Sequence, residues 1–323
     1  MVLFSIGAAS GWYMRRAWAL RNFAAPKLPR QIREKGHIFT NPLLFCEAYP
    51  SETSAFQPLE TKMAQYAAEY QNKKKVTSFS AYFRDLTSGR WIGVNDIASY
   101  DPASLLKVPL LIAYLKEAEN DPGLLSKKLL YPGETGNDGQ QKEFYHLQPN
   151  TRYAINDLLG AMIVESDNAA KDLLFSAMNL TTQNEIFSDL GIQIIQNLNS
   201  PYTISAKNYG LFFRILYNAT YLNREMSEKA LELLSRANFK DGIVASVPQG
   251  TPVAHKFGQY GERDTTSPTG ETWELHDCGI VYNPSRPYLL CVMTRGADLG
   301  ALKSLIQGIS KIAYQEVENN YKN

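Results

Sequence analysis

The sequence predicts an α+β fold, in which an antiparallel sheet flanked by helices lies beside an all-helical lobe, with any active site at the seam. Two observations lead to this prediction. Segments rich in β-forming residues occur near both ends of the 323-residue chain, so their strands must join into one sheet. Helical periodicity dominates from about residue 105 to residue 237, which indicates a separate helical layer.

The expected elements follow in a regular order along the chain. Leu59, Met63, Tyr66 and Tyr70 recur at helical spacing and open the series. Helices are expected over residues 57–73, 105–119, 155–178, 181–190, 206–221, 227–237 and 302–317. Strands are expected over 77–86, 90–94, 253–258, 278–282 and 288–294, the first two as a hairpin. Turn residues fill 129–150, which is expected to be a surface loop.

The first 55 residues are predicted to lie outside the folded body, which spans 56–318 and is followed by a tail at 319–323. Residues 1–21 are expected to be an apolar segment, the end of a truncated membrane anchor, because Arg15 and Arg16 follow its apolar run like an interfacial flank. The run is shorter than the roughly 20 residues that span a bilayer, so an N-terminal amphipathic helix, packed on the body or disordered, is the alternative. Residues 22–55 contain four prolines and no sustained period, as expected of a connector.

Charge and composition exclude two classes of function. The chain has 33 basic and 32 acidic side chains and a formal net charge of +1, so no strong positive field is available for nucleic acid. Three cysteines and four histidines show no spacing typical of a metal site, and no metal or other cofactor is expected. Cys278 and Cys291 lie on consecutive predicted strands and could pair, with Cys46 as an alternative partner of either.

The first motif with chemical potential is Ser104-Leu-Leu-Lys107, at the start of the helix expected over 105–119. Residues three apart share a helix face, so Lys107 should lie beside the Ser104 hydroxyl. A lysine shielded from water has a lowered pKa and can take the proton of a serine nucleophile. By itself the motif is weak evidence, because Ser104 could be a helix N-cap and Lys107 a surface lysine.

Two further motifs contain polar residues among apolar ones. Ser166-Asp167-Asn168 follows an apolar helical run, and it could pass a proton and hold a substrate amide, or form an N-cap between two helices. Lys256-Phe257-Gly258 lies on the first C-terminal strand. Its lysine could face a cleft and its glycine could admit a ligand backbone, or the lysine could protect a sheet edge from aggregation.

In combination, S-x-x-K at 104, S-D-N at 166 and K-x-G at 256 resemble the signatures of the class A β-lactamase and penicillin-binding protein superfamily. The resemblance covers roughly residues 55–318 and implies a serine β-lactamase-like catalytic domain with the β-lactamase/transpeptidase-like fold. It implies that Ser104 is the acylated nucleophile, that Lys107 activates it, and that Ser166 passes a proton to the leaving nitrogen.

The same resemblance implies the substrate-binding residues. Asn168 corresponds to a ligand of the substrate amide, and Lys256 to the cation that faces the substrate carboxylate. The oxyanion hole would use the backbone N–H groups of Ser104 and of Gln259, the residue after Gly258.

The sequence departs from the family pattern at two places. Phe257 stands where the family has a threonine whose hydroxyl helps to bind the substrate carboxylate, and Arg295 is considered as a substitute anchor. Class A β-lactamases also carry a glutamate that activates the deacylating water. The best match here, Ile195-Gln-Asn-Leu-Asn199, has isoleucine at that position, so slow deacylation is expected.

The resemblance leaves several functions open. The leading hypothesis is a β-lactam hydrolase, and the first alternative is a D-alanyl-D-alanine peptidase or transpeptidase of peptidoglycan metabolism. A penicillin-binding sensor that is acylated once and a serine esterase with the same core are the others. Small-molecule β-lactams or D-alanyl peptides are the expected substrates. A monomer outside the cytoplasmic membrane, associated with it through the N-terminus, is expected.

Overall fold

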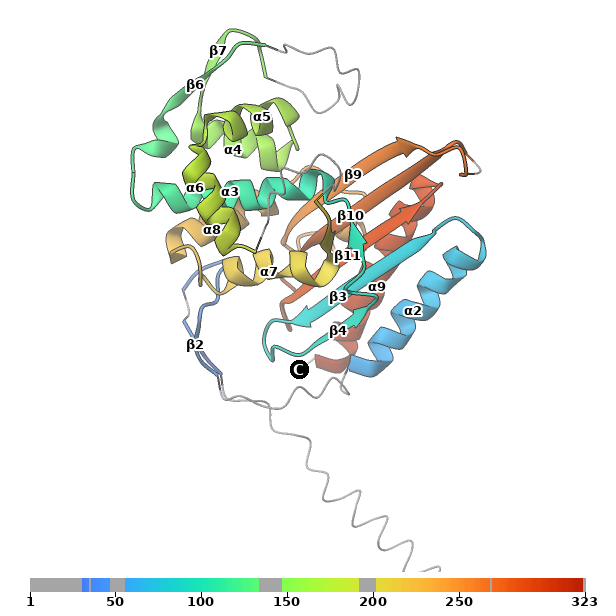
Figure 1. Ribbon diagram of the computed structural model, residues 1–323. Coiled ribbons are helices and arrows are strands. Elements are labelled where there is room, and N and C mark those ends of the chain that lie inside the picture. Colours follow the sequence, from blue (N-terminus) through green and yellow to red (C-terminus); the bar gives the residue numbers. More distant parts are fainter. Residues whose placement is uncertain are drawn as a thin grey trace, which may run out of the picture.

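The structure, a computed structural model, describes residues 31–34, 36–46, 56–133, 147–191, 202–267 and 269–321. Its centre is a five-stranded antiparallel sheet with the strand order β4-β3-β11-β10-β9 (Figure 1). The strands are β3 (Ser78–Asp85), β4 (Trp91–Val94), β9 (Val253–Arg263), β10 (Glu271–Val281) and β11 (Tyr288–Gly296). Because β3 pairs directly with β11, the predicted union of strands from the two ends of the chain is confirmed.

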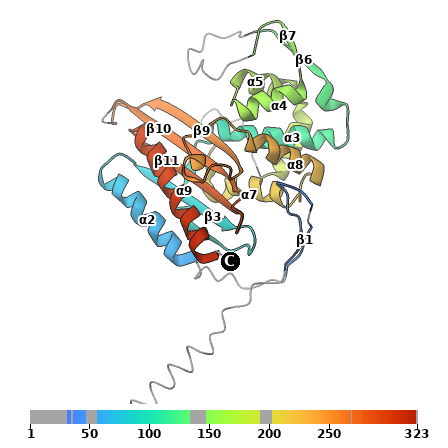
Figure 2. The ribbon, with the colours of Figure 1, turned by 180° about the vertical axis from the view of Figure 1, so that it is seen from behind.

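Two helices cover one face of this sheet. They are α2 (Gln57–Asn72) and α9 (Leu299–Tyr321), which lie side by side across the strands (Figure 2). Their apolar stripes meet alternate residues of β3 and β11, such as Phe79, Phe83 and Val292, in one buried cluster. We call this side of the sheet the back face.

The opposite face, here called the site face, meets the helical lobe (Figure 1). The helices of this lobe are α3 (Lys107–Ala118), α4 (Ile155–Val164), α5 (Asn168–Ala177), α6 (Leu180–Asp189), α7 (Ala206–Tyr217) and α8 (Arg224–Ser235). Nearly every residue of α3 is buried, because this helix is apolar on all sides and crosses the centre of the lobe. The predicted α+β fold is therefore correct.

The boundaries of several predicted elements are wrong. The segment 129–150, expected to be a loop, begins and ends in a short ladder between β6 (Lys128–Tyr131) and β7 (Thr151–Ala154). Four residues are too few to display a period, and part of this segment lies outside the described residues. The helix expected over 155–178 is interrupted between α4 and α5.

The C-terminal elements are longer than predicted. Strands β9 and β10 form a hairpin that extends beyond the predicted strand ends. The outer half of this hairpin carries exposed polar residues, so the sequence there lacks the apolar pattern of a buried strand. Helix α9 continues to Tyr321, beyond the expected boundary at 318. The expected connector also contains two short strands, β1 (Gln31–Arg33) and β2 (Leu43–Cys46), which pair with each other.

A disulfide joins Cys278 of β10 to Cys291 of β11, at directly paired positions whose Cα atoms are 3.9 Å apart. The sequence left this pairing open, with Cys46 as an alternative partner of either cysteine. Among the described residues, no helix is long and apolar enough to cross a membrane. The predicted anchor segment 1–21 lies outside the described residues.

Candidate active site

Ser104 lies in a 3₁₀ turn, Ala103–Leu106, that continues directly into α3. Two short strands, β5 (Ser99–Tyr100) and β8 (Ile204–Ser205), pair just before this turn. The backbone of Ala103 has φ 46°, a left-handed conformation that is costly for a residue with a side chain. We refer to residues 101–106 as the nucleophile turn. The N-cap interpretation of Ser104 is wrong, because Pro102 and Leu106 occupy the two cap positions.

Lys107 lies in the first turn of α3 and is buried, with 1% of its surface exposed. Its Nζ is 3.1 Å from Ser104 Oγ and 3.1 Å from Ser166 Oγ. It is also 2.6 Å from the backbone oxygen of Ser166 and 2.7 Å from Asn168 Oδ1. The sequence prediction that Lys107 lies beside Ser104 is therefore confirmed, and the surface-lysine interpretation is wrong.

The break between α4 and α5 brings Ser166 and Asn168 to Lys107. Asp167 caps α5, since its carboxylate accepts a hydrogen bond from the N–H of Ala170 at 2.7 Å. Ser166 precedes the cap with φ 56°, which turns the chain away from the axis of α4. The cap thus ends one helix and starts the next, and it leaves Ser166 and Asn168 facing the lysine.

Lys256 reaches the same serine from the sheet. It lies on the edge strand β9, yet only 1% of its surface is exposed, so it does not act as a solvated edge lysine. Its Nζ donates a hydrogen bond to Ser166 Oγ at 3.0 Å and another to the backbone oxygen of Phe257 at 3.0 Å. Ser166 therefore stands between two lysines, one from the helical lobe and one from the sheet.

Both lysines have lowered pKa values. Burial is the main cause for Lys107, and with the nearby positive charge of Lys171 it lowers the pKa to about 7. Burial also lowers the pKa of Lys256 well below its usual value, and the neighbouring Lys107 adds to this effect. Removal from water disfavours the charged form of an amine, so a buried lysine can accept a proton near neutral pH.

Gly258 allows the sheet to approach the nucleophile turn. A Cβ atom at this position would lie 2.7 Å from the backbone oxygen of Pro102 and 3.3 Å from the backbone nitrogen of Leu105. A side chain is therefore excluded by backbone atoms that have no room to move. This close approach places β9 against the nucleophile turn at Gly258. The oxyanion hole formed by the N–H groups of Ser104 and Gln259 stays a prediction.

Phe257, which departs from the family pattern, and Arg295, considered as a substitute anchor, both have defined partners. The ring of Phe257 stacks on Phe239 with centroids 4.1 Å apart, and Lys256 Nζ lies 4.2 Å from the Phe257 centroid. Arg295, considered as a substitute anchor, is bound instead to the carboxylate of Glu274, with its Nε 2.6 Å from Oε1. Its charge is therefore already engaged within the protein.

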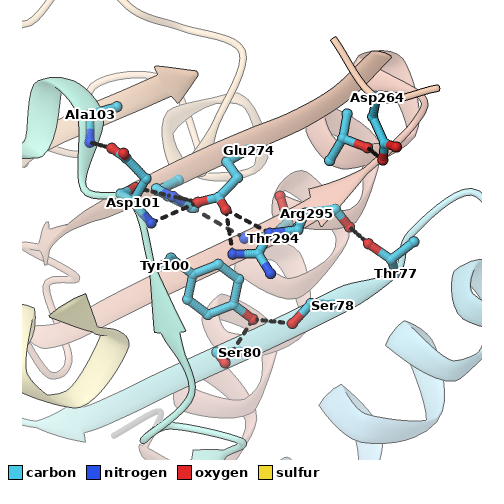
Figure 3. A network of polar contacts seen from close by, with 12 residues as sticks. Thr77, Ser78, Ser80, Tyr100, Asp101, Ala103, Asp264, Glu274, Thr294 and Arg295 are labelled. Carbon is cyan, nitrogen blue, oxygen red and sulfur yellow. Dashed lines mark hydrogen bonds and ion pairs between the residues drawn. The ribbon is translucent and has the colours of Figure 1, made fainter. Parts of the chain in front are cut away.

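A polar network that the sequence pattern did not predict joins Asp101 of the nucleophile turn to Glu274 and His276 of β10. Figure 3 shows Asp101 and Glu274 facing each other. The spacing of Glu274 and His276 on β10 was the available signal, because residues two apart on a strand share a face. Among the described residues, no group of three histidine, cysteine or carboxylate side chains could hold a metal ion. The segment 195–199, where the missing glutamate was considered, lies outside the described residues.

Comparison with curated proteins finds no match. Among solved structures, a mutant of PBP-A in an acyl-enzyme complex with penicillin G is 21% identical, with TM-score 0.65 over 81% of this chain and 97% of that one. A β-lactamase from Sphaerobacter thermophilus is 20% identical, with TM-score 0.64 over 80% of this chain and 98% of that one. A class A β-lactamase from Mycobacterium abscessus is 20% identical, with TM-score 0.63 over 80% of this chain and 98% of that one.

At these identities the structural likeness shows a shared fold. A family profile described as the β-lactamase enzyme family matches residues 58–317, which is most of the chain and includes all three motifs. The chain therefore belongs to the β-lactamase enzyme family.

Proposed function

We propose that this protein is a class A β-lactamase-like serine hydrolase that reacts with β-lactams through an acyl-enzyme on Ser104. The observation that carries the proposal is the 3.1 Å contact between Ser104 Oγ and Lys107 Nζ. Because the pKa of Lys107 is lowered to about 7, a large fraction of this amine is neutral near pH 7. A neutral amine at this distance can remove the serine proton.

The contacts of Lys107 are compatible with the neutral form. The backbone oxygen of Ser166 and Oδ1 of Asn168 only accept hydrogen bonds, and they are the two shortest contacts, at 2.6 and 2.7 Å. They use both N–H groups of a neutral amine. The remaining lone pair is then available to the hydroxyls, each 3.1 Å away. Of the two serines, Ser104 is partly exposed whereas Ser166 is buried.

Acylation follows from this arrangement. Ser104 Oγ forms a bond to the lactam carbonyl carbon while its proton passes to Lys107. The N–H groups of Ser104 and Gln259 stabilise the negative charge on the carbonyl oxygen. As the C–N bond breaks, Ser166 gives its proton to the nitrogen and receives the one held by Lys107. One proton thus moves from Ser104 to the leaving nitrogen, and the other groups return to their starting state.

We propose that deacylation is slow. Hydrolysis of the acyl-enzyme needs a base that activates water, and none of the four contacts of Lys107 Nζ given above is a carboxylate. The sequence also has isoleucine at position 195, where the class A pattern has glutamate. The acyl-enzyme should therefore persist for longer than in an enzyme that possesses this base.

A D-alanyl-D-alanine peptidase or transpeptidase of peptidoglycan metabolism is the second candidate. Ile195 favours it, because transfer of the acyl group to an amine does not require the hydrolytic base. A location outside the cytoplasm suits both candidates. The disulfide between Cys278 and Cys291 supports this location, since such bonds persist mainly in oxidising compartments.

The test is to incubate the full chain with benzylpenicillin and to follow intact mass and penicilloate together, beside Ser104→Ala. An adduct on the wild type that decays while penicilloate accumulates is expected for the slow hydrolase. A stable adduct without turnover would favour the peptidase or a sensor, and D-alanyl-D-alanine peptides would then be offered. No adduct on the wild type would contradict the proposal.

A further inference from the structure

A buried polar network connects the sheet to the nucleophile turn (Figure 3). Glu274 and His276 project from the same face of β10 and are 7% and 0% exposed. Arg295 of β11 lies opposite Glu274 in the sheet register. A carboxylate is rarely buried unless its charge is paired and its oxygens accept hydrogen bonds. The partners of this carboxylate therefore indicate what it does.

Glu274 links Arg295 to the nucleophile turn. Its Oε1 accepts a hydrogen bond from Arg295 Nε at 2.6 Å, and its Oε2 accepts one from the backbone N–H of Asp101 at 2.9 Å. Burial raises the pKa of Glu274, but the hydrogen bond from His276 and the charge of Arg295 outweigh it and leave the pKa lowered. The ionised carboxylate is thus the form that holds Asp101.

The hydrogen bonds of His276 define its tautomer. Its Nδ1 accepts a hydrogen bond from the backbone N–H of Thr294 at 3.3 Å, so the ring proton is on Nε2. That N–H donates to the backbone oxygen of Asp101 at 2.9 Å and also lies 3.2 Å from Glu274 Oε2. His276 and Glu274 therefore hold both the carbonyl and the N–H of one residue, Asp101.

Asp101 passes this constraint toward Ser104. Its Oδ1 accepts a hydrogen bond from the N–H of Ala103 at 2.8 Å, and Ala103 is the residue with the left-handed backbone. Such a conformation persists only where its surroundings enforce it. The next residue is Ser104, whose hydroxyl and backbone N–H are both assigned to acylation. The network thus ends one residue before the nucleophile.

We propose that Glu274 and His276 are positioning residues for Ser104. They act through Asp101 and Ala103, and they set the orientation of the Ser104 hydroxyl toward Lys107 and of its N–H toward the oxyanion. The inference rests on the proposed acylation of Ser104. Misplacement of a reacting group by about 1 Å can slow a reaction about 100-fold, so loss of the network should slow acylation without abolishing it.

The test compares Glu274→Ala, His276→Leu and His276→Gln in the full chain. Glutamine can present an N–H near the position of Nε2, whereas leucine cannot. The control is Arg286→Ala, because Arg286 and Asp85 form another buried ion pair, 2.8 Å long, at the opposite end of β3 and β11. Each variant is assayed for its second-order rate of acylation by benzylpenicillin and for its melting temperature.

We expect Glu274→Ala and His276→Leu to acylate about 10- to 100-fold more slowly, yet to full stoichiometry. His276→Gln should stay within about 5-fold of the wild type, and Arg286→Ala should lose stability but acylate within about 2-fold. Glu274→Ala acylating as fast as the wild type would overturn the inference. The inference would also be overturned if acylation slowed in proportion to the loss of melting temperature in every variant, Arg286→Ala included.

A fluorophosphonate probe separates this inference from the proposed function. It reacts with an activated serine without any β-lactam recognition. Benzylpenicillin could leave the wild type unmodified while the probe still labels Ser104. In that case, slower labelling of Glu274→Ala and His276→Leu than of the wild type supports the inference, and equal labelling rates overturn it. If neither reagent labels wild-type Ser104, the turn holds no active nucleophile, and both proposals fail together.

Discussion

Two buried pairs of histidine and carboxylate lie on neighbouring positions of β9 and β10 but point to opposite faces of the sheet. His276 and Glu274 lie on the site face. His255 and Asp277 alternate with them and lie on the back face, with His255 Nδ1 2.8 Å from Asp277 Oδ1. Both histidines and both carboxylates are buried, so burial and residue type do not distinguish the two pairs.

The next hydrogen bond along each network does distinguish them. On the back face, Asp277 Oδ2 accepts the N–H of Ile243 at 2.8 Å, and the carbonyl of Ile243 accepts a hydrogen bond from Ser310 of α9. That pair therefore holds two parts of the scaffold together. On the site face the corresponding bonds end at Asp101, beside the nucleophile. Similar chemistry should serve stability on one face and catalysis on the other.

The largest effect is expected for Lys107→Ala on the site face. It removes the proposed base, so acylation by benzylpenicillin should fall about 1000-fold or more. The folded state should survive, because a buried lysine is itself costly to keep out of water. Stopped-flow acylation and thermal melting measure the two quantities. Acylation within about 10-fold of the wild type would show that another group takes the proton.

The second effect concerns the back face. Asp277→Ala should lower the free energy of unfolding by about 3 kcal/mol, because the N–H of Ile243 and the ring of His255 lose their buried partner. Acylation by the folded fraction should change less than about 3-fold. Denaturant unfolding and active-site titration give the two values. Asp277→Asn, which keeps one acceptor oxygen, is the milder control.

A loss of acylation in Asp277→Ala as large as that in Glu274→Ala would break the comparison between the faces. A small effect on the site is expected, because the negative charge of Asp277 favours the charged form of Lys256. The pKa of Lys256 should fall further when this charge is removed. The same variant therefore measures how far the back face influences the site.

The smallest effect is expected at the edge of the site. Phe257→Thr restores the hydroxyl that the family uses for the substrate carboxylate, so acylation by benzylpenicillin should rise about 10-fold, the value of one added hydrogen bond. Stability should fall slightly, since stacking on Phe239 is lost. Phe257→Leu removes the same stacking without adding a hydroxyl. An equal rise of the acylation rate in both variants would show that the smaller side chain, and not the added hydroxyl, causes the effect.

The sequence was sufficient to predict the features that depend on spacing and periodicity. Ser104 and Lys107 meet because residues three apart share a helix face. The consecutive strands of Cys278 and Cys291 made their pairing possible, but the sequence left Cys46 as an equal alternative, and only the structure shows the bridge. The network beneath Ser104 could not be predicted in this way. It joins Asp101 to Glu274 and His276, more than 170 positions away, and nothing local specifies which polar residues a folded chain brings together.

The break between α4 and α5 was predicted only in part from the sequence. Ser166-Asp167-Asn168 was considered as either an N-cap or a catalytic motif, and the structure shows the N-cap. Asp167 caps α5, while Ser166 and Asn168 contact Lys107. Helical periodicity continues through these residues, so the pattern predicted one helix where the cap produces two.

The central claim is that neutral Lys107 is the base that activates Ser104. The most direct measurement is the second-order rate of acylation by benzylpenicillin between pH 5 and pH 9, because this rate reports ionisation of the free enzyme. Protonated Lys107 cannot accept the serine proton. The rate should therefore fall about tenfold per pH unit below the pKa of about 7 and reach a plateau above it. A rate that stays flat from pH 5 to pH 9 would contradict the claim.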